Sequence, residues 1–250
     1  MFSFQFASDL HIEINDANID PLNYIVPTAD ILILAGDIGS LYKLDQLFNF
    51  IKDLSIHFKY ILYVPGNHEY YMMHNYNAVS INMLKNRLAK ISNKIDNLLI
   101  LDKDSVVIDN VCIAGCTLWS EPQCKIPNFI VKIKGINNEI YKSYHKEDLE
   151  YINKMIDYCN EKKYKLVMVT HYPPTYKTLE NAKKRYKFIS LYATNLEYLL
   201  DENKVNTWIC GHVHTNFDFK SDNNCRIVSN QKGKPKDKIE NYSTNFIIKF

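Results

Sequence analysis

Five apolar runs in the sequence are each followed directly by side chains that can bind a metal ion or transfer a proton. These positions read DLH (9–11), GDIG (36–39), GNHE (66–69), THYPP (170–174) and GHVH (211–214). Their carboxylate, amide and imidazole groups offer oxygen and nitrogen donors and no thiolate. Such a set suits manganese, iron or zinc and disfavours a closed structural zinc site built from cysteines.

The motifs supply more candidate ligands than one ion can use. Two ions that share one bridging carboxylate would use them all. A pair of metals about 3.5–4 Å apart is the usual apparatus for in-line hydrolysis of a phosphate ester. The residue types therefore indicate a two-metal hydrolase. The candidate ligands are Asp9, His11, Asp37, Asn67, His171, His212 and His214.

Glycine and histidine usage points to the same positions. The chain has seven glycines, and four of them, Gly36, Gly39, Gly66 and Gly211, lie in these motifs. Five of its eight histidines belong to the same set. Glycine permits positive φ and close approach of the backbone. A glycine-poor chain is therefore expected to use it mainly where side chains must be aimed.

The apolar runs have the composition of buried strands, and segments with helical spacing lie between them. Alternation of the two favours an α/β layered fold, in which sites form at the carboxyl ends of strands. We predict helices around residues 44–51, 77–91, 149–159 and 195–203. The predicted strands are Phe2–Ala7, Ile31–Ala35, Tyr60–Val64, Val111–Leu118, Leu166–Thr170, Thr207–Cys210 and Phe246–Phe250.

The chain is expected to form one domain over residues 1–250, with two packed mixed β-sheets flanked by helices. The sheets are predicted to be mixed because short strands follow one another without helices from Ser105 to Leu118 and from His214 onward. Two segments, at about 120–146 and 173–193, fit no regular element and follow strand ends. We expect these segments to be loops or caps above the site.

Two basic stretches lie outside the motifs. Lys183, Lys184, Arg185 and Lys187 form a cluster that is either solvated surface or a source of phosphate contacts. The Lys-rich stretch Gln231–Lys238 is expected to be mobile, and the turn Ser229–Pro235 is assigned no role.

Composition limits the other classes of function. Hydrophobic content of 46% and charged content of 23% are those of a soluble globular protein. The net charge of +2 gives no electrostatic footprint for an extended nucleic acid or a membrane surface. The N-terminus shows no signal-peptide pattern, and no run of 18 apolar residues occurs. We expect a cytoplasmic protein with reduced cysteines and a small substrate.

The ordered motifs closely resemble the signature of the calcineurin-like metallophosphoesterase superfamily. That signature is Asp-x-His, Gly-Asp, Gly-Asn-His-Glu/Asp, His and Gly-His-x-His, and the matching residues span Asp9 to His214. One four-letter match such as GNHE is expected by chance about once in a thousand chains of this length, and five in order leave little room for accident. The resemblance implies that family's fold and a phosphoesterase activity.

The resemblance also implies roles for the ligands. Two divalent ions would be bound, with manganese favoured and iron or zinc as alternatives, and water or hydroxide between them would be the nucleophile. The implied ligands are Asp9, His11 and His214 for the first ion, Asn67, His171 and His212 for the second, and Asp37 as the bridge.

Two neighbours of Asn67 receive other roles from the resemblance. His68 matches the family's non-ligand histidine and would assist the leaving group as an acid or hydrogen-bond donor. Glu69 would orient a ligand rather than bind metal. His57, His74 and His145 are interpreted as ordinary core or surface residues.

Departures from particular branches bear on the substrate. Ser40 occupies the position at which purple acid phosphatases carry a tyrosine ligand, so an iron–tyrosinate colour is not expected. Residues 36–43 read GDIGSLYK and lack the arginine with which Ser/Thr protein phosphatases grip phosphate. A nucleotide-type phosphodiester is therefore slightly favoured as substrate. The alternatives are a phosphomonoesterase, a nuclease, or a non-catalytic metal-binding scaffold on the same fold.

Overall fold

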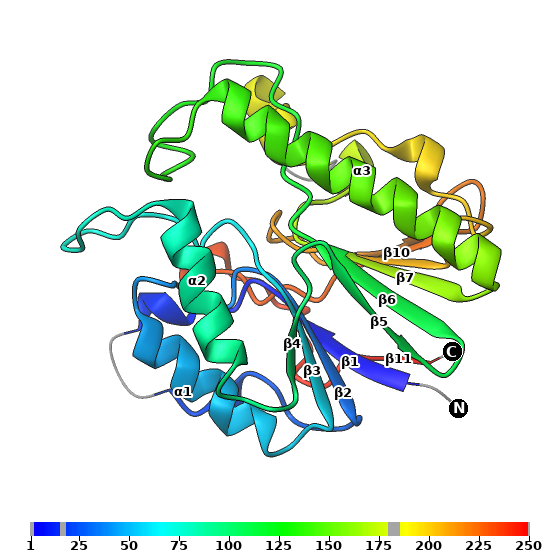
Figure 1. Cartoon of the computed structure of the whole chain (residues 1–250), viewed down its shortest axis with the longest axis horizontal. Helices are drawn as coiled ribbons and strands as arrows, with labels where there is room; N and C mark the ends of the chain where they lie inside the picture. Colours follow the sequence, from blue (N-terminus) through cyan, green and yellow to red (C-terminus); the bar gives the residue numbers. More distant parts are fainter. Residues whose placement is uncertain (1–2, 16–18, 180–185, 250) are drawn as a thin grey trace.

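The computed structural model describes residues 3–15, 19–179 and 186–249 and contains two stacked β-sheets (Figure 1). The first has the order β11-β1-β2-β3-β4 and the second β5-β6-β7-β8-β10-β9. The first comprises β1 (Ser3–Ala7), β2 (Ile31–Ala35), β3 (Tyr60–Val64), β4 (Leu98–Ile100) and β11 (Ile247–Lys249). The second comprises β5 (Asp104–Ile108), β6 (Val111–Cys116), β7 (Lys165–Thr170), β8 (Thr207–Ile209), β9 (Asp218–Lys220) and β10 (Arg226–Val228).

Both sheets are mixed, as the sequence predicts. β1 to β4 are parallel and β11 adds antiparallel to β1. In the second sheet β6, β7, β8 and β10 are parallel, while the outer strands β5 and β9 are antiparallel. The parallel centre of each sheet brings the carboxyl ends of its strands to one edge, where the motif residues follow.

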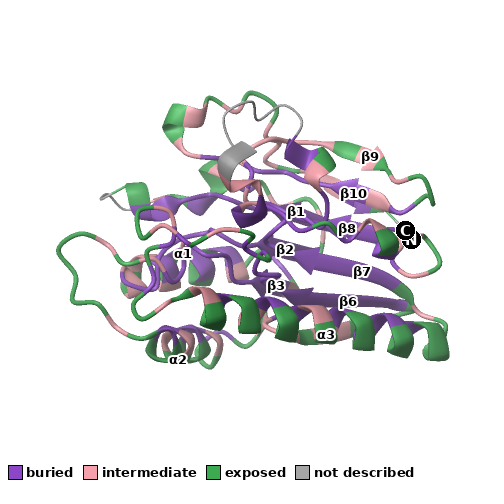
Figure 2. Ribbon diagram, turned by 90° about the horizontal axis from the view of Figure 1, so that it is seen from above, coloured by how far each residue is buried: buried purple, intermediate pink, exposed green. Residues whose placement is uncertain are grey.

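The central strands are buried on both faces, which explains their uninterrupted apolar runs. In β2, Ile31, Ile33 and Ala35 belong to the core between the sheets, whereas Leu32 and Leu34 belong to the core on the other face. α1 (Leu44–Ser55) and α2 (Ile81–Ser92) flank the first sheet, and α3 (Asn138–Lys162) runs along the second (Figure 1). Figure 2 shows buried strands between helices whose outer faces are exposed.

Residues 138–146 were expected to belong to a loop, but they form the first turns of α3. The side chains buried there and in the following turn include Tyr141 and the polar residues His145 and Asp148. The Nδ1 atom of His145 lies 2.6 Å from the carbonyl oxygen of Trp119, and Asp148 accepts a hydrogen bond from the Trp119 N–H at 3.2 Å. Because these positions are not apolar, hydrophobic spacing does not detect the start of the helix.

The helix predicted around residues 195–203 is wrong. Only a single 3₁₀ turn, Glu197–Leu199, forms there. The side chains of Asn195 and Asp201 accept hydrogen bonds from the backbone N–H groups of Glu197 and Asn203. Such local bonds compete with the helical ladder at both ends of the segment.

The segment 173–193 contains 3₁₀ turns at Tyr176–Leu179 and Tyr186–Leu191 rather than a continuous loop. Lys183, Lys184 and Arg185 of the basic cluster lie outside the described residues, as does the side chain of Lys187. No helix in the described part of the chain has the length and apolarity needed to cross a bilayer.

Candidate metal centre

The structure brings all seven predicted ligands together where the two sheets' carboxyl ends meet. Their donor atoms form overlapping groups in which every atom lies within 4.8 Å of the others. One group is Asp9, His11 and His214, and another is Asp37, His171 and His212. Asn67 joins the second group, since its Oδ1 lies 2.9 Å from His171 Nε2.

The first group has imidazole nitrogens that face each other. His11 Nε2 and His214 Nε2 are 3.0 Å apart, and His214 Nε2 is 3.3 Å from Asp9 Oδ1. The outer nitrogens have acidic partners, because His11 Nδ1 lies 3.0 Å from Glu13 and His214 Nδ1 lies 2.5 Å from Asp237. A carboxylate beyond the ring fixes the tautomer that leaves the inner nitrogen free for metal.

The second group is arranged in the same way. His171 Nδ1 lies 3.0 Å from the carbonyl oxygen of Ala35, which can only accept, so this nitrogen carries the proton. His171 Nε2 then faces Asp37 Oδ1 at 3.3 Å and His212 Nδ1 at 3.3 Å. Once the proton on His171 Nε2 is displaced, these inward-facing atoms are all electron-pair donors, and such a set fits a bound cation.

Asp37 lies between the two groups. Its Oδ1 is 3.3 Å from His171 Nε2, and its Oδ2 is 3.8 Å from His11 Nε2. One carboxylate therefore faces an imidazole of each group with a different oxygen. A carboxylate placed in this way could be shared by two ions.

The electrostatics of the groups favour positive charge. Burial alone would raise the pKa of Asp9, but the hydrogen bond from His214 and the charges of His171 and His214 lower it to about 2. Burial alone would lower the pKa of His171, but the charge and hydrogen bond of Asp37 raise it to about 9. Without metal, a proton on His171 therefore compensates the buried carboxylates.

The backbone at the site is held in an uncommon conformation. Five of the candidate ligands have positive φ, between 48° and 72°: Asp9, His11, Asp37, His212 and His214. The left-handed region costs an ordinary residue about 1–2 kcal/mol. Such outliers gather at functional sites, where the surrounding structure enforces them.

Two of the motif glycines are required by close approach. A Cβ atom on Gly66 would lie 2.3 Å from Asp37 Oδ1, and one on Gly211 would lie 2.4 Å from Asp9 Oδ2. Distances under 3.0 Å force something to move. Each glycine therefore makes room for a carboxylate that comes from a different strand end.

Glu69 is fully buried and organises the backbone that carries Asp37. Its carboxylate accepts hydrogen bonds from the N–H groups of Asp37 (3.1 Å), Ile38 (2.8 Å) and Gly66 (2.8 Å). The hydroxyl of Tyr63 donates a fourth bond at 2.6 Å. This arrangement agrees with the interpretation of Glu69 as a residue that orients a ligand.

The arrangement matches a known family. The model of calcineurin-like phosphoesterases matches residues 2–216 of the chain. The chain belongs to the calcineurin-like phosphoesterase family. It is a metal-dependent phosphoesterase with a metal site of His and Asp residues.

Individual relatives of this phosphoesterase cover nearly its whole length. An uncharacterized protein of Acanthamoeba polyphaga mimivirus is 28% identical over 258 residues, which cover 92% of this chain and 90% of the relative. The crystal structure of phosphopantetheinyl hydrolase from Mycobacterium tuberculosis has a TM-score of 0.76 at 16% identity and covers 98% of this chain and 95% of that one. A dimetal phosphatase from Danio rerio has a TM-score of 0.56 at 13% identity, covering 91% and 86%. The predicted fold class is thereby confirmed.

Sequence reasoning missed three polar residues of the phosphoesterase site. Glu13 has a faint signal, since it stands two residues after His11, just beyond the DLH motif. Lys234 and Asp237 lie in the Lys-rich stretch Gln231–Lys238, which was expected to be mobile. Instead it packs on the site: the N–H groups of Lys232 and Gly233 donate to the carbonyl oxygens of Ser8 and Asp9, at 3.2 and 2.9 Å.

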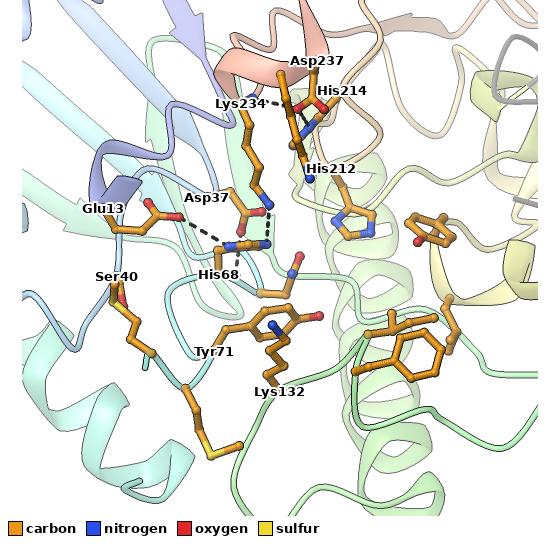
Figure 3. Close-up of a pocket in the computed structure, with 18 of the residues that line it drawn as sticks. Glu13, Asp37, Ser40, His68, Tyr71, Lys132, His212, His214, Lys234 and Asp237 are labelled. Carbon is orange, nitrogen blue, oxygen red and sulfur yellow. Dashed lines mark hydrogen bonds and ion pairs between the residues drawn. The ribbon is translucent and has the colours of Figure 1, made fainter. Parts of the chain in front are cut away.

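A pocket of about 710 Å³ opens over the metal centre (Figure 3). Its polar side includes ligands of both groups, His68 and Lys234. Its other side is rich in apolar and aromatic residues. The latter are Tyr71, Met72, Met73, Phe129, Ile130, Phe188, Leu191 and Tyr192.

Metal binding to the phosphoesterase is expected to release protons. The pKa of His171 is raised to about 9, so its ring is protonated at pH 7.5 in the metal-free protein, and an ion that binds Nε2 must displace that proton. Apparent manganese affinity should therefore fall as the pH decreases below about 9. Calorimetric titration in buffers of different ionisation enthalpy measures the release, and heats that do not depend on the buffer would contradict the expectation.

The raised pKa of His171 also makes the stability of the metal-free fold depend on pH. Because the pKa of His171 is raised from 6.5 in the unfolded chain, its contribution to stability is fully present below pH 6.5. That contribution is lost as the pH rises through about 9.

Proposed function

We propose that the chain hydrolyses small phosphodiesters of nucleotide type with two metal ions. The observation that carries this proposal is the position of Asp37 between two groups of inward-facing imidazole nitrogens. In this proposal Asp37 bridges the ions. Asp9, His11 and His214 hold the first ion, and Asn67, His171 and His212 hold the second.

Manganese is the favoured metal, with iron or zinc as alternatives, and the bound pair would activate water as the nucleophile and neutralise charge on the phosphoryl group. His68 differs from the ligands in its exposure, since its side chain is 25% exposed and faces the pocket. Its backbone N–H donates to Asp37 Oδ1 at 2.7 Å, which holds the ring beside the metal groups. From there His68 would donate a proton or a hydrogen bond to the leaving oxygen.

The apolar wall supports a leaving group with a flat ring. The Phe129 and Phe188 rings meet edge to face with centroids 6.4 Å apart, and Phe129 is 72% exposed. A nucleobase stacked on an aromatic side chain gains about 1–3 kcal/mol. Because these residues come from the segments at about 120–146 and 173–193, we propose that those segments determine specificity as parts of the single domain.

The other candidates have less support. A nuclease on long strands needs many phosphate contacts, and the described lysines that line the pocket are Lys132, Lys234 and Lys236. A scaffold without catalysis would not need His68 beside an intact set of ligands. A phosphomonoesterase differs from the favoured function only in substrate.

Turnover by metal-stripped protein after addition of manganese, zinc, magnesium or iron(II) tests the proposal. We expect metal-dependent hydrolysis of bis-p-nitrophenyl phosphate in preference to p-nitrophenyl phosphate. Preference for the monoester would exclude the diesterase. Two bound ions without turnover of either ester would favour the scaffold. A steep decrease in nucleic-acid affinity with salt would favour the nuclease.

A further inference from the structure

The ammonium group of Lys234 reaches into the pocket from a loop that the proposed function has not used. In Figure 3 it extends from the upper wall to the ring of His68, while Glu13 meets the same ring from another side. The distance from Lys234 Nζ to His68 Nε2 is 3.1 Å, and that from Glu13 Oε1 to His68 Nδ1 is 3.4 Å. A donor atom of His68 lies within 4.8 Å of those of His11 and Asp37, so the ammonium stands next to the metal groups.

The loop holds Lys234 in place through the metal ligands themselves. The Lys234 N–H donates to Asp237 Oδ2 at 2.8 Å, and the same oxygen lies 2.5 Å from His214 Nδ1. One residue earlier, the Gly233 N–H donates to the carbonyl oxygen of Asp9 at 2.9 Å. The backbone at Lys234 is therefore tied to two residues of the first metal group.

Among the described residues the tip of Lys234 forms no close ion pair, although its charge helps to lower the pKa of Asp237. Within the described part of the chain, no carboxylate oxygen lies within 4.0 Å of its Nζ. The ammonium donates one N–H to the unprotonated Nε2 of His68, a contact that it must leave before this nitrogen can carry a proton for the leaving oxygen. Its two other N–H groups are left for other acceptors. A half-buried cation of this kind, which lines the pocket, is suited to an anion bound there.

We propose that Lys234 binds the phosphoryl oxygens of the substrate and is a catalytic residue of this site, an inference that rests on the proposed function. A lysine ammonium binds phosphate as a point charge. It would take over the task of the arginine that is missing from residues 36–43. The positive group is thus supplied from the other end of the chain.

Calorimetric binding of inorganic phosphate to the manganese-loaded protein tests this role without requiring turnover. Lys234→Gln and Lys234→Met should weaken phosphate binding at least about tenfold, as expected for loss of a hydrogen bond to a charged group. Lys234→Arg should keep most of the affinity. Lys238→Asn is the matched control, because Lys238 is exposed on the same loop and its φ of 53° suits asparagine.

Metal content and thermal stability of each variant are measured alongside. Glutamine keeps an N–H donor for His68. If Lys234 only positions the His68 ring, Lys234→Gln should therefore bind phosphate as tightly as the parent. That result would overturn the proposal. If Lys234→Gln binds phosphate normally while the parent hydrolyses diesters, this inference fails and the proposed function stands. If the parent binds phosphate through Lys234 but hydrolyses neither ester, the proposed function fails and the anion site stands.

Discussion

An Asp37→Asn variant is expected to lose metal-dependent turnover by at least about a thousandfold, well beyond the roughly 10- to 100-fold cost of losing a residue that merely supports a ligand. The substitution keeps the size of the side chain and removes its charge. Asp37 belongs to two of the three donor groups, and each of its oxygens faces an imidazole of a different group. An amide has one ligating oxygen and no charge, so it cannot bridge two cations.

Elemental analysis and steady-state rates measure this effect together. Asp37→Asn should retain less than two ions per chain, whereas Asp157→Asn, which makes the same change on the exposed face of α3, should retain both ions and full activity. An Asp37→Asn protein that kept two ions and parental turnover would show that this carboxylate does not bridge the ions.

The sequence predicts that these side chains lie close together because the candidate ligands closely follow strands. A parallel strand that is buried on both faces reads as an apolar run, and the residue after it necessarily lies at the sheet edge. Asp37 follows β2 and Asn67 follows β3 in this way, and the pairing of Ala35 with Val64 brings the two strand ends side by side. Local pattern is therefore enough to predict where these candidate ligands lie.

The partners of the ligands could not be predicted in the same way. Asp237 and Lys234 reach His214 and His68 across 23 and 166 residues of sequence. Their loop has lysines, glycine and proline, a composition typical of solvated surface. Only the backbone hydrogen bonds to Ser8 and Asp9 show that the loop packs on the site. The start of α3 was missed for a related reason, since His145 and Asp148 are buried through hydrogen bonds to Trp119 rather than through apolar contact.

A His68→Ala variant is expected to lose about 10²- to 10⁴-fold in kcat/KM for esters with poor leaving groups, the usual range for loss of a general acid. The side chain of His68 is partly exposed, and its ring lies between Glu13 and Lys234, next to the candidate metal ligands. If it assists the leaving oxygen, the loss should be small for nitrophenolate, which leaves readily as an anion, and large for an alkoxide.

A series of diesters with leaving groups of increasing pKa measures this dependence. The plot of log kcat/KM against leaving-group pKa should be steeper for His68→Ala than for the parent, while two ions per chain are retained. His57→Ala is the control, because His57 is an exposed histidine beyond the end of α1, and it should follow the parent line.

Since a donor atom of His68 lies within 4.8 Å of those of His11 and Asp37, the competing role of His68 is that of a metal ligand. Loss of an ion from His68→Ala with an equal decrease for every leaving group would establish that role and exclude the acid.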